Sequence, residues 1–215
     1  MKKQIKAQWL ENESRENLQF ILAEYRFLVH RFMQWIGLTF GKSSNERVRQ
    51  LLLHNIIDEC GRIGGDPSHL SYLDDCLASC GVVASEHYKP RPSTRRIEKW
   101  FFDVYQHRDC HVCLSVLGPG TESISQQFLK PLEAGLRHAF AGQKVDYKYF
   151  DVHRPEVEIA HAEDIAKALA IVEQSTESAV RKKFEKERIH WAEQAIAHHA
   201  EFWTSLKEKH KKRIP

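Results

Sequence analysis

Residues 18–36 read LQFILAEYRFLVHRFMQWI, and this stretch gives a strong indication of the fold. Apolar side chains recur in it every three or four residues, which is the spacing of one face of an α-helix. That apolar face is formed by Leu18, Ile21, Leu22, Tyr25, Leu28, Val29, Phe32, Trp35 and Ile36. Its width predicts a long helix packed into a hydrophobic core, and Gly37 is expected to end the helix.

Helical spacing continues through the rest of the chain, and glycine and proline residues separate the segments. Further helices are expected at about residues 43–60, 67–80, 94–113, 121–140, 143–172 and 176–209. Ser43 with Glu46 is expected to cap the first of these helices. Pro67 is expected to open the second, and Pro131 to kink the fourth. The sequence contains no series of alternating strand-like runs and no internal repeat, so we predict an all-α class, a bundle of about seven helices.

The length and charge of the chain limit its function. Its 215 residues fit a single helical domain over 1–215, in which the basic C-terminal end at residues 207–215 is expected to fray. The formal net charge of +3 is too small to indicate a dedicated nucleic-acid binder. No run approaches the roughly 18–20 consecutive apolar residues of a membrane-spanning helix, so no membrane partner is expected.

Cysteine usage and the N-terminus indicate a compartment. The five cysteines form no even set of disulfide partners. Met1-Lys2-Lys3 is followed by polar residues instead of the apolar core of a signal peptide. We therefore expect a reduced chain in the cytoplasm.

Thirteen histidines make a metal site worth seeking, and one segment has suitable spacing. Glu158 and His161 are three residues apart, so they share one helical face. Glu-x-x-His is the unit with which helix bundles hold two iron or manganese ions, although an isolated pair also occurs on solvated faces. His153 lies about 80° round an ideal helix from His161, and the two converge if the backbone bends near Pro155.

A second acid and imidazole pair consists of Glu59 and His69. They lie on two expected helices joined by a short turn, which can bring the helices together as antiparallel neighbours. Glu59 falls on the apolar side of its helix, where an unpaired carboxylate needs a metal, an arginine partner or a raised pKa. Glu122 is a third candidate, just after Gly118-Pro119-Gly120, and its alternative role is a carboxylate at a helix start.

These pieces together resemble a known family. Glu59 with His69 ten residues on, a lone Glu122, and a His/acid/His cluster ahead of Ala162-Glu163-Asp164 resemble the haem-oxygenase-like di-iron oxidases and oxygenases, over roughly residues 47–169. The helix layout is similar to the TenA and PqqC type of fold. The resemblance implies two Fe²⁺ ions per chain, held by Glu59, His69, Glu122, His153, Glu158 and His161.

The last cluster departs from the family pattern. That pattern usually reads His-x-x-x-Asp/Glu-x-x-His, whereas here His153 stands one position early and Arg154 occupies the place of the ligand. A local helix bulge of the kind found at functional sites would restore the histidine. Without such a bulge we expect one metal ion or none.

The resemblance implies an oxidase or oxygenase that uses O₂ as co-substrate to oxidise a small amino acid-, amine- or fatty acid-like metabolite. Glu59, Glu122 and Glu158 would serve catalysis, an external reductase or other electron donor would supply electrons, and the chain would form a homodimer. Two alternatives stay open. One is a metal-free TenA/PqqC-like enzyme that acts on a thiamin- or quinone-related substrate, and the other is a non-catalytic helical binding protein.

Other residues have competing interpretations. The zinc-like cluster His107, Cys110, His111 and Cys113 is not expected to converge, because one unbroken helix would place the four side chains on diverging faces. His190, His198, His199 and His210 are expected to be exposed on the charged last helix. Tyr25 faces the expected core, and some members of the resembled family use an inward tyrosine chemically. His30 would be the axial ligand if haem were bound, and Arg62 or Lys130 could pair with a substrate carboxylate.

Overall fold

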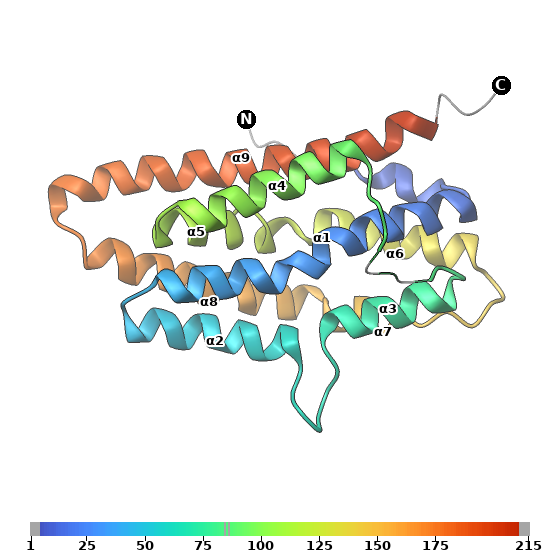
Figure 1. The fold of residues 1–215 in the computed structure, drawn as a ribbon, viewed down its shortest axis with the longest axis horizontal. Helices are drawn as coiled ribbons and strands as arrows, with labels where there is room; N and C mark the ends of the chain where they lie inside the picture. The colour runs from blue at the N-terminus through green and yellow to red at the C-terminus, as the bar shows by residue number, and fades with distance from the viewer. Residues whose placement is uncertain (1–4, 84, 86, 211–215) are drawn as a thin grey trace.

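The computed structural model of the chain describes residues 5–83, 85 and 87–210, and every regular element within them is helical (Figure 1). The helices of 11 residues or more are α1 (Arg15–Lys42), α2 (Glu46–Cys60), α3 (His69–Ser79), α4 (Pro92–His107), α6 (Gln126–Ala139), α8 (Pro155–Gln174) and α9 (Ser178–His210). The shorter ones are α5 (Cys110–Leu117), α7 (Lys148–Val152) and the 3-10 helices η1 (Gln8–Asn12) and η2 (Glu122–Ile124). The predicted all-α class is confirmed.

Helix α1 runs through the middle of the bundle. It packs against α2, α3, α4, α5 and α6, with α4 and α9 along one side of it in Figure 1 and α2, α3 and α8 along the other. Most of its predicted apolar face is buried, including Leu18, Ile21 and Ile36. The expected end at Gly37 is wrong. Glycine inside a helix costs only about 1 kcal/mol relative to alanine, and the buried Ile36 and Thr39 on either side keep the helix intact.

Four predicted boundaries differ in the structure, because side-chain caps and backbone breaks decide where the helices begin and end. Asn45 caps α2 by accepting hydrogen bonds from two backbone N–H groups, in place of the predicted capping box. Helix α3 begins at His69 after the cap Ser68, and not at Pro67 as predicted. The helix expected at residues 94–113 divides into α4 and α5 at an extended Arg108, and the one expected at residues 143–172 divides into α7 and α8 just before Pro155.

The segment between α5 and η2 passes through a tight space that only glycine fits. A Cβ atom on Gly120 would lie 2.6 Å from Cβ of Ala195 on α9, and one on Gly118 would lie 2.6 Å from Cγ2 of Ile165 on α8. The backbone can therefore run between α8 and α9. This route carries the next residue of interest, Glu122, into the interior of the bundle, where it is buried.

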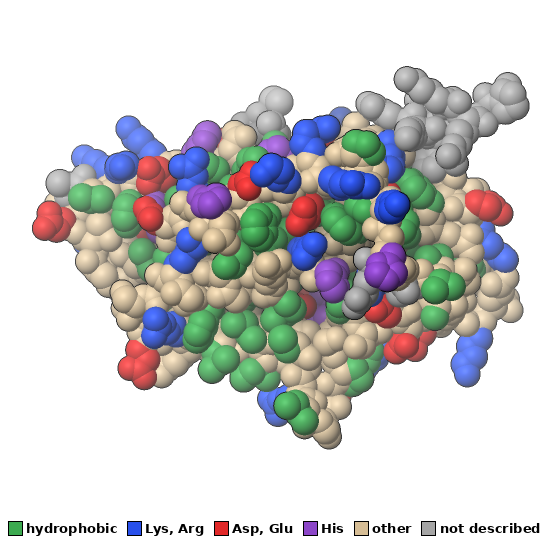
Figure 2. Space-filling view, viewed as in Figure 1, with side chains coloured by type: hydrophobic (Ala, Val, Ile, Leu, Met, Phe, Trp, Pro, Cys, Tyr) green, Lys and Arg blue, Asp and Glu red, His purple; other side chains and the backbone are tan. Residues whose placement is uncertain are grey.

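The face shown in Figure 2 carries both apolar and charged side chains. Apolar side chains gather over α2, where Leu53 and Ile57 are exposed, and charged side chains gather over α4 and α9. No helix in the described part of the chain is long and apolar enough to span a membrane. Helix α9 continues to His210, and residues 211–215, the rest of the basic end expected to fray, lie outside the described residues.

Candidate metal centre

The six predicted ligands come from separate elements that meet in the core. Their positions are Glu59 in the last turn of α2, His69 at the start of α3, Glu122 in η2, His153 directly after α7, and Glu158 and His161 in α8. Five of these side chains are buried, and His153 is half-buried. Buried ionisable groups are rare unless they are paired or bind a metal, so their gathering in one place needs an explanation.

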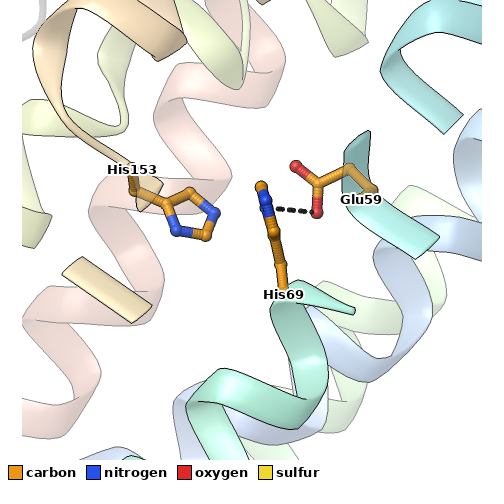
Figure 3. Close-up of side chains that lie close together, drawn as sticks. All are labelled: Glu59, His69 and His153. Carbon is orange, nitrogen blue, oxygen red and sulfur yellow. Dashed lines mark ion pairs between the residues drawn. The ribbon is translucent and has the colours of Figure 1, made fainter. Parts of the chain in front are cut away.

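Glu59, His69 and His153 form the tightest part of the cluster (Figure 3). Nδ1 of His69 lies 3.1 Å from Oε2 of Glu59, and the His69 and His153 ring centres are 4.5 Å apart. One potential ligand atom from each of the three residues lies within 4.8 Å of the others. Ligand atoms about 2.1 Å from one ion lie up to about 4 Å apart, so modest side-chain movement would let the three share one cation.

A break in the helix accommodates the early position of His153. The residue follows α7, Arg154 is extended, and Pro155 is the first residue of α8. The Arg154 side chain is exposed and lies 2.9 Å from Asp151, while His153 turns towards His69. The backbone therefore bends near Pro155, as the sequence suggested, but it does so by a break between two helices and not by a bulge within one.

The backbone fixes the protonation pattern of the His153 ring. Nδ1 lies 2.7 Å from the carbonyl oxygen of Tyr149, to which it donates its hydrogen. Nε2 therefore keeps a free lone pair. Burial lowers the pKa of His153 to about 4, so the ring is neutral at neutral pH. A neutral imidazole held by its second nitrogen is the form in which histidine binds metals.

The carboxyl groups of Glu122 and Glu158 contact each other. Burial raises the pKa of Glu122 well above its usual value, and the Glu158 and Glu59 carboxylates raise it further. Burial also raises the pKa of Glu158, although the hydroxyl group of Ser125 contacts its carboxylate and partly offsets this. Two such carboxyl groups retain a proton at neutral pH unless a cation replaces it.

The imidazoles of His69 and His161 carry unmet hydrogen-bonding capacity. Burial lowers the pKa of His69, but contact with Glu59 outweighs this and leaves the pKa raised. Even so, Nδ1 of His69 makes no hydrogen bond of good geometry, and neither does the buried Nδ1 of His161. Buried nitrogens without a well-aligned hydrogen bond are costly, and both are suited to a metal. The other nitrogen of His161, Nε2, lies 3.3 Å from Asp58, an orienting carboxylate that the sequence analysis missed.

Four of the six residues, Glu59, Glu122, His153 and Glu158, line a partly open cavity. The centre of a water molecule could occupy about 70 Å³ of it, which is room for a few waters or a small ligand. Tyr25 is buried in the core as predicted, it lines this cavity, and its hydroxyl lies 2.8 Å from that of Tyr149. The opposite wall comes from α9, which contributes His199, Phe202 and Trp203. The expectation that His199 is exposed is wrong, because it is 8% exposed.

The competing candidates do not assemble a site. His111 is engaged by Glu187 at 2.8 Å, and Sγ of Cys113 faces backbone carbonyls. The four residues of the zinc-like cluster do not lie on one unbroken helix, because the chain breaks between α4 and α5. His30 and Arg62 are exposed and do not line the cavity. Lys130 lies in a surface groove that reaches Glu122 and Glu158 from outside. Among the described residues, the three donors that converge as one metal-binding group are Glu59, His69 and His153.

Comparison with known sequences places residues 19–186 within a family model described as iron-containing redox enzyme. The 4-chloro-allylglycine synthase of Streptantibioticus cattleyicolor is 27% identical over 148 residues, which are 67% of this chain and 54% of that protein. The chain thus spans about half the length of the curated relative it matches.

Solved structures share the fold. A CADD-like protein of unknown function from Nostoc punctiforme aligns with a TM-score of 0.76 at 19% identity, covering 94% of this chain and 86% of that one. A TenA homologue from Pseudomonas syringae aligns with a TM-score of 0.75 at 13% identity, covering 94% and 84%. A domain of unknown function with a haem oxygenase-like fold from Shewanella denitrificans gives 0.73 at 13%, covering 94% and 83%. The predicted haem-oxygenase/TenA-like fold is confirmed.

Proposed function

The chain belongs to the family of iron-containing redox enzymes, and from this premise we propose that it is a non-haem di-iron oxidase or oxygenase. Its ligands would be the six residues predicted from the sequence, namely Glu59, His69, Glu122, His153, Glu158 and His161. The observation that carries the proposal is their convergence from five elements, with the Glu59, His69 and His153 donors close together beside the facing Glu122 and Glu158 carboxyl groups.

The chemistry of these residues fits two Fe²⁺ ions. Carboxylates are hard ligands that can bridge two ions, and imidazoles suit iron while leaving positions free. Three ionised carboxylates would offset three of the four positive charges of two Fe²⁺ ions. A cation would also replace the proton that Glu122 and Glu158 otherwise retain, and would satisfy the orphaned nitrogens of His69 and His161.

Bound iron would supply the coupling of O₂ reduction to substrate oxidation. The chain's own residues would orient the ligands and control protons. The Tyr149 carbonyl holds the His153 ring with Nε2 unprotonated. In the pair of hydroxyls of Tyr25 and Tyr149, one proton lies between the two oxygens and the other is free to donate elsewhere. Aromatic side chains of α1, α6 and α9 line the rest of the cavity and exclude water.

For the substrate we propose a small amino acid-like or amine-like molecule, since the relative with a named activity is a 4-chloro-allylglycine synthase. The size of the cavity suits such a molecule. A two-electron oxidation of the substrate supplies only two of the four electrons that full reduction of O₂ to water requires. The other two would come from an external donor. The predicted homodimer and the cytoplasmic location stay predictions.

The test is metal content. The parent chain, purified without chelators after growth with ample iron, is compared with Glu158→Ala/His161→Ala by mass spectrometry of metals. His190→Ala/Glu193→Ala is the matched control, because it removes an exposed histidine and acid at the same spacing on α9. We expect about two irons per chain in the parent and the control, and a clear loss in the α8 variant.

Absence of iron from the parent, together with no uptake of Fe²⁺ by the metal-free protein, would contradict the proposal. That result would favour the metal-free TenA-like enzyme or the binding protein, because the shared fold is compatible with both. Activity that survives chelation unchanged would point to the metal-free enzyme.

A further inference from the structure

His199 on α9 is a buried polar group that the proposed iron chemistry leaves without a role. It is 8% exposed and lines the same cavity as the candidate ligands, but on the α9 wall. In Figure 1, α9 lies on the opposite side of α1 from α2 and α3, which carry Glu59 and His69. A ligand that fills the cavity between the two walls would therefore lie beside both His199 and the candidate metal centre.

Hydrogen bonding determines which His199 nitrogen carries the proton. The hydroxyl of Thr121 donates to the carbonyl of Val116 at 2.9 Å, and this carbonyl belongs to the last turn of α5, where carbonyls lack helical partners. With its one proton used, Thr121 can only accept from Nε2 of His199, 3.2 Å away. Nε2 is thus protonated, and Nδ1 bears a lone pair that has no hydrogen-bond partner among the described residues.

The surroundings of His199 favour a positively charged hydrogen-bond donor. The Phe128 ring is stacked 6.1 Å from the imidazole, and Phe128, Trp203 and Tyr25 form one aromatic cluster in the cavity lining. The faces of these aromatic rings attract ammonium groups. Burial lowers the pKa of His199 to about 3, so the ring stays a neutral acceptor at neutral pH.

We infer that the α9 side of the cavity is a subsite for an ammonium group of the substrate, with Nδ1 of His199 as the acceptor. The inference deepens the proposed function and rests on it only in taking this cavity as the substrate site. His199 is then a positioning residue that selects amines over alcohols and carboxylates. It would direct the other end of the molecule towards the metal centre.

Binding of small probes tests the inference without catalysis. The fluorescence of Trp35 and Trp203, which line the cavity, is followed while n-butylamine hydrochloride, n-butanol or sodium butyrate is added to metal-free parent protein. We expect n-butylammonium to bind about tenfold or more tightly than either of the other two, which is the strength of one charge-assisted hydrogen bond. Equal binding of all three, or no binding of the amine, would overturn the inference.

Two substitutions distinguish the roles of the two ring nitrogens of His199. His199→Asn keeps an acceptor oxygen near the place of Nδ1 but loses the Thr121 contact, whereas His199→Gln keeps a donor near Nε2 and loses the acceptor. We expect the Gln variant to bind the amine about tenfold more weakly and the Asn variant to stay within about twofold of the parent. A merely structural role, holding Thr121, predicts the reverse order and would refute the inference.

A second measurement serves if either variant fails to fold. Long-range ¹H–¹⁵N correlation spectra of the parent should show His199 as the neutral Nε2–H tautomer, and n-butylammonium should shift its Nδ1 resonance. An Nδ1–H tautomer would contradict the assignment. Fe²⁺ uptake by the same metal-free proteins keeps the two proposals apart. Amine binding with no uptake of Fe²⁺ would support the subsite and overturn the di-iron centre, and uptake of Fe²⁺ with no amine binding would do the opposite.

Discussion

Two histidine–glutamate pairs in this molecule look alike but differ in their surroundings. His69 and Glu59 lie 3.1 Å apart with both side chains buried. His111 and Glu187 lie 2.8 Å apart, but the Glu187 side chain is 32% exposed, and the His111 ring is stacked on Phe184 at 4.0 Å. The second pair makes a hydrogen bond and its carboxylate is partly exposed to solvent, whereas Nδ1 of His69 lies near Glu59 without a hydrogen bond of good geometry. What marks a candidate metal site is therefore unmet bonding capacity and a third donor, and not the pair itself.

The largest effect on iron content is expected when the glutamate of each pair is replaced. Glu59→Ala deletes a predicted ligand and should lower iron by at least about one ion per chain, because the remaining donors no longer enclose the site. Glu187→Ala should leave iron unchanged. Metal analysis of both variants, alongside circular dichroism for helix content, checks the prediction. Equal iron loss in the two variants would show that the difference between the two pairs does not decide where iron binds.

A smaller effect is expected from the third donor, His153, whose position depends on the break before α8. Pro155→Ala permits α7 and α8 to join and would turn the ring away, so Fe²⁺ affinity should fall by about 10–100-fold, the usual effect of misorienting a ligand. Pro92→Ala is the matched control, since Pro92 also begins a helix, α4, with no predicted ligand near it in sequence. Titration of metal-free protein with Fe²⁺ under anaerobic conditions measures both, and unchanged affinity in Pro155→Ala would contradict the role given to the break.

The smallest effect concerns the stability of the metal-free chain. Because burial and then neighbouring carboxylates raise the pKa of Glu122, the folded state holds a proton that the unfolded chain releases above pH about 4.3. The contribution of this group to the free energy of unfolding is fully present below that pH, and it is lost as the pH rises through the pKa that Glu122 has in the folded chain. Glu122→Gln cannot ionise, so its melting temperature should exceed that of the parent by a growing margin as pH rises. Each kcal/mol corresponds to about 2–4 °C in a chain of this size.

Thermal unfolding with a chelator present, at pH 6 and pH 8, measures that margin. The exposed Glu185→Gln serves as control and should shift neither value. A margin that stays constant or shrinks between the two pH values would show that Glu122 is already ionised in the folded chain.

Sequence periodicity predicted the helices well where one face of a helix is buried along its length, as at Leu18 and Ile21 of α1. It failed at the breaks, because apolar spacing continues across Arg108 and across the α7–α8 junction while the backbone does not. The six predicted ligands do gather in the core, since Glu-x-x-His spacing and a buried acid are local signals. That these residues bind iron stays a prediction.

Asp58 and His199 escaped the sequence analysis for a different reason. Asp58 looks like an ordinary surface acid until α8 packs beside α2 and brings His161 within reach. Helix α9 is rich in charged residues, so no clear apolar stripe marks His199 as buried. Burial of that kind is set by tertiary packing, and the sequence of the helix itself carries little trace of it.

The tight passage at Gly118 and Gly120 also limits how the cavity can evolve. These glycines hold the backbone against Ile165 and Ala195 with no space for a methyl group, so the segment that carries Glu122 is packed tightly against α8 and α9. Displacing α9 to widen the cavity would therefore also displace the carboxylate of Glu122. A lineage that acquires larger substrates therefore has to trim side chains such as Phe202 and leave its backbone where it is.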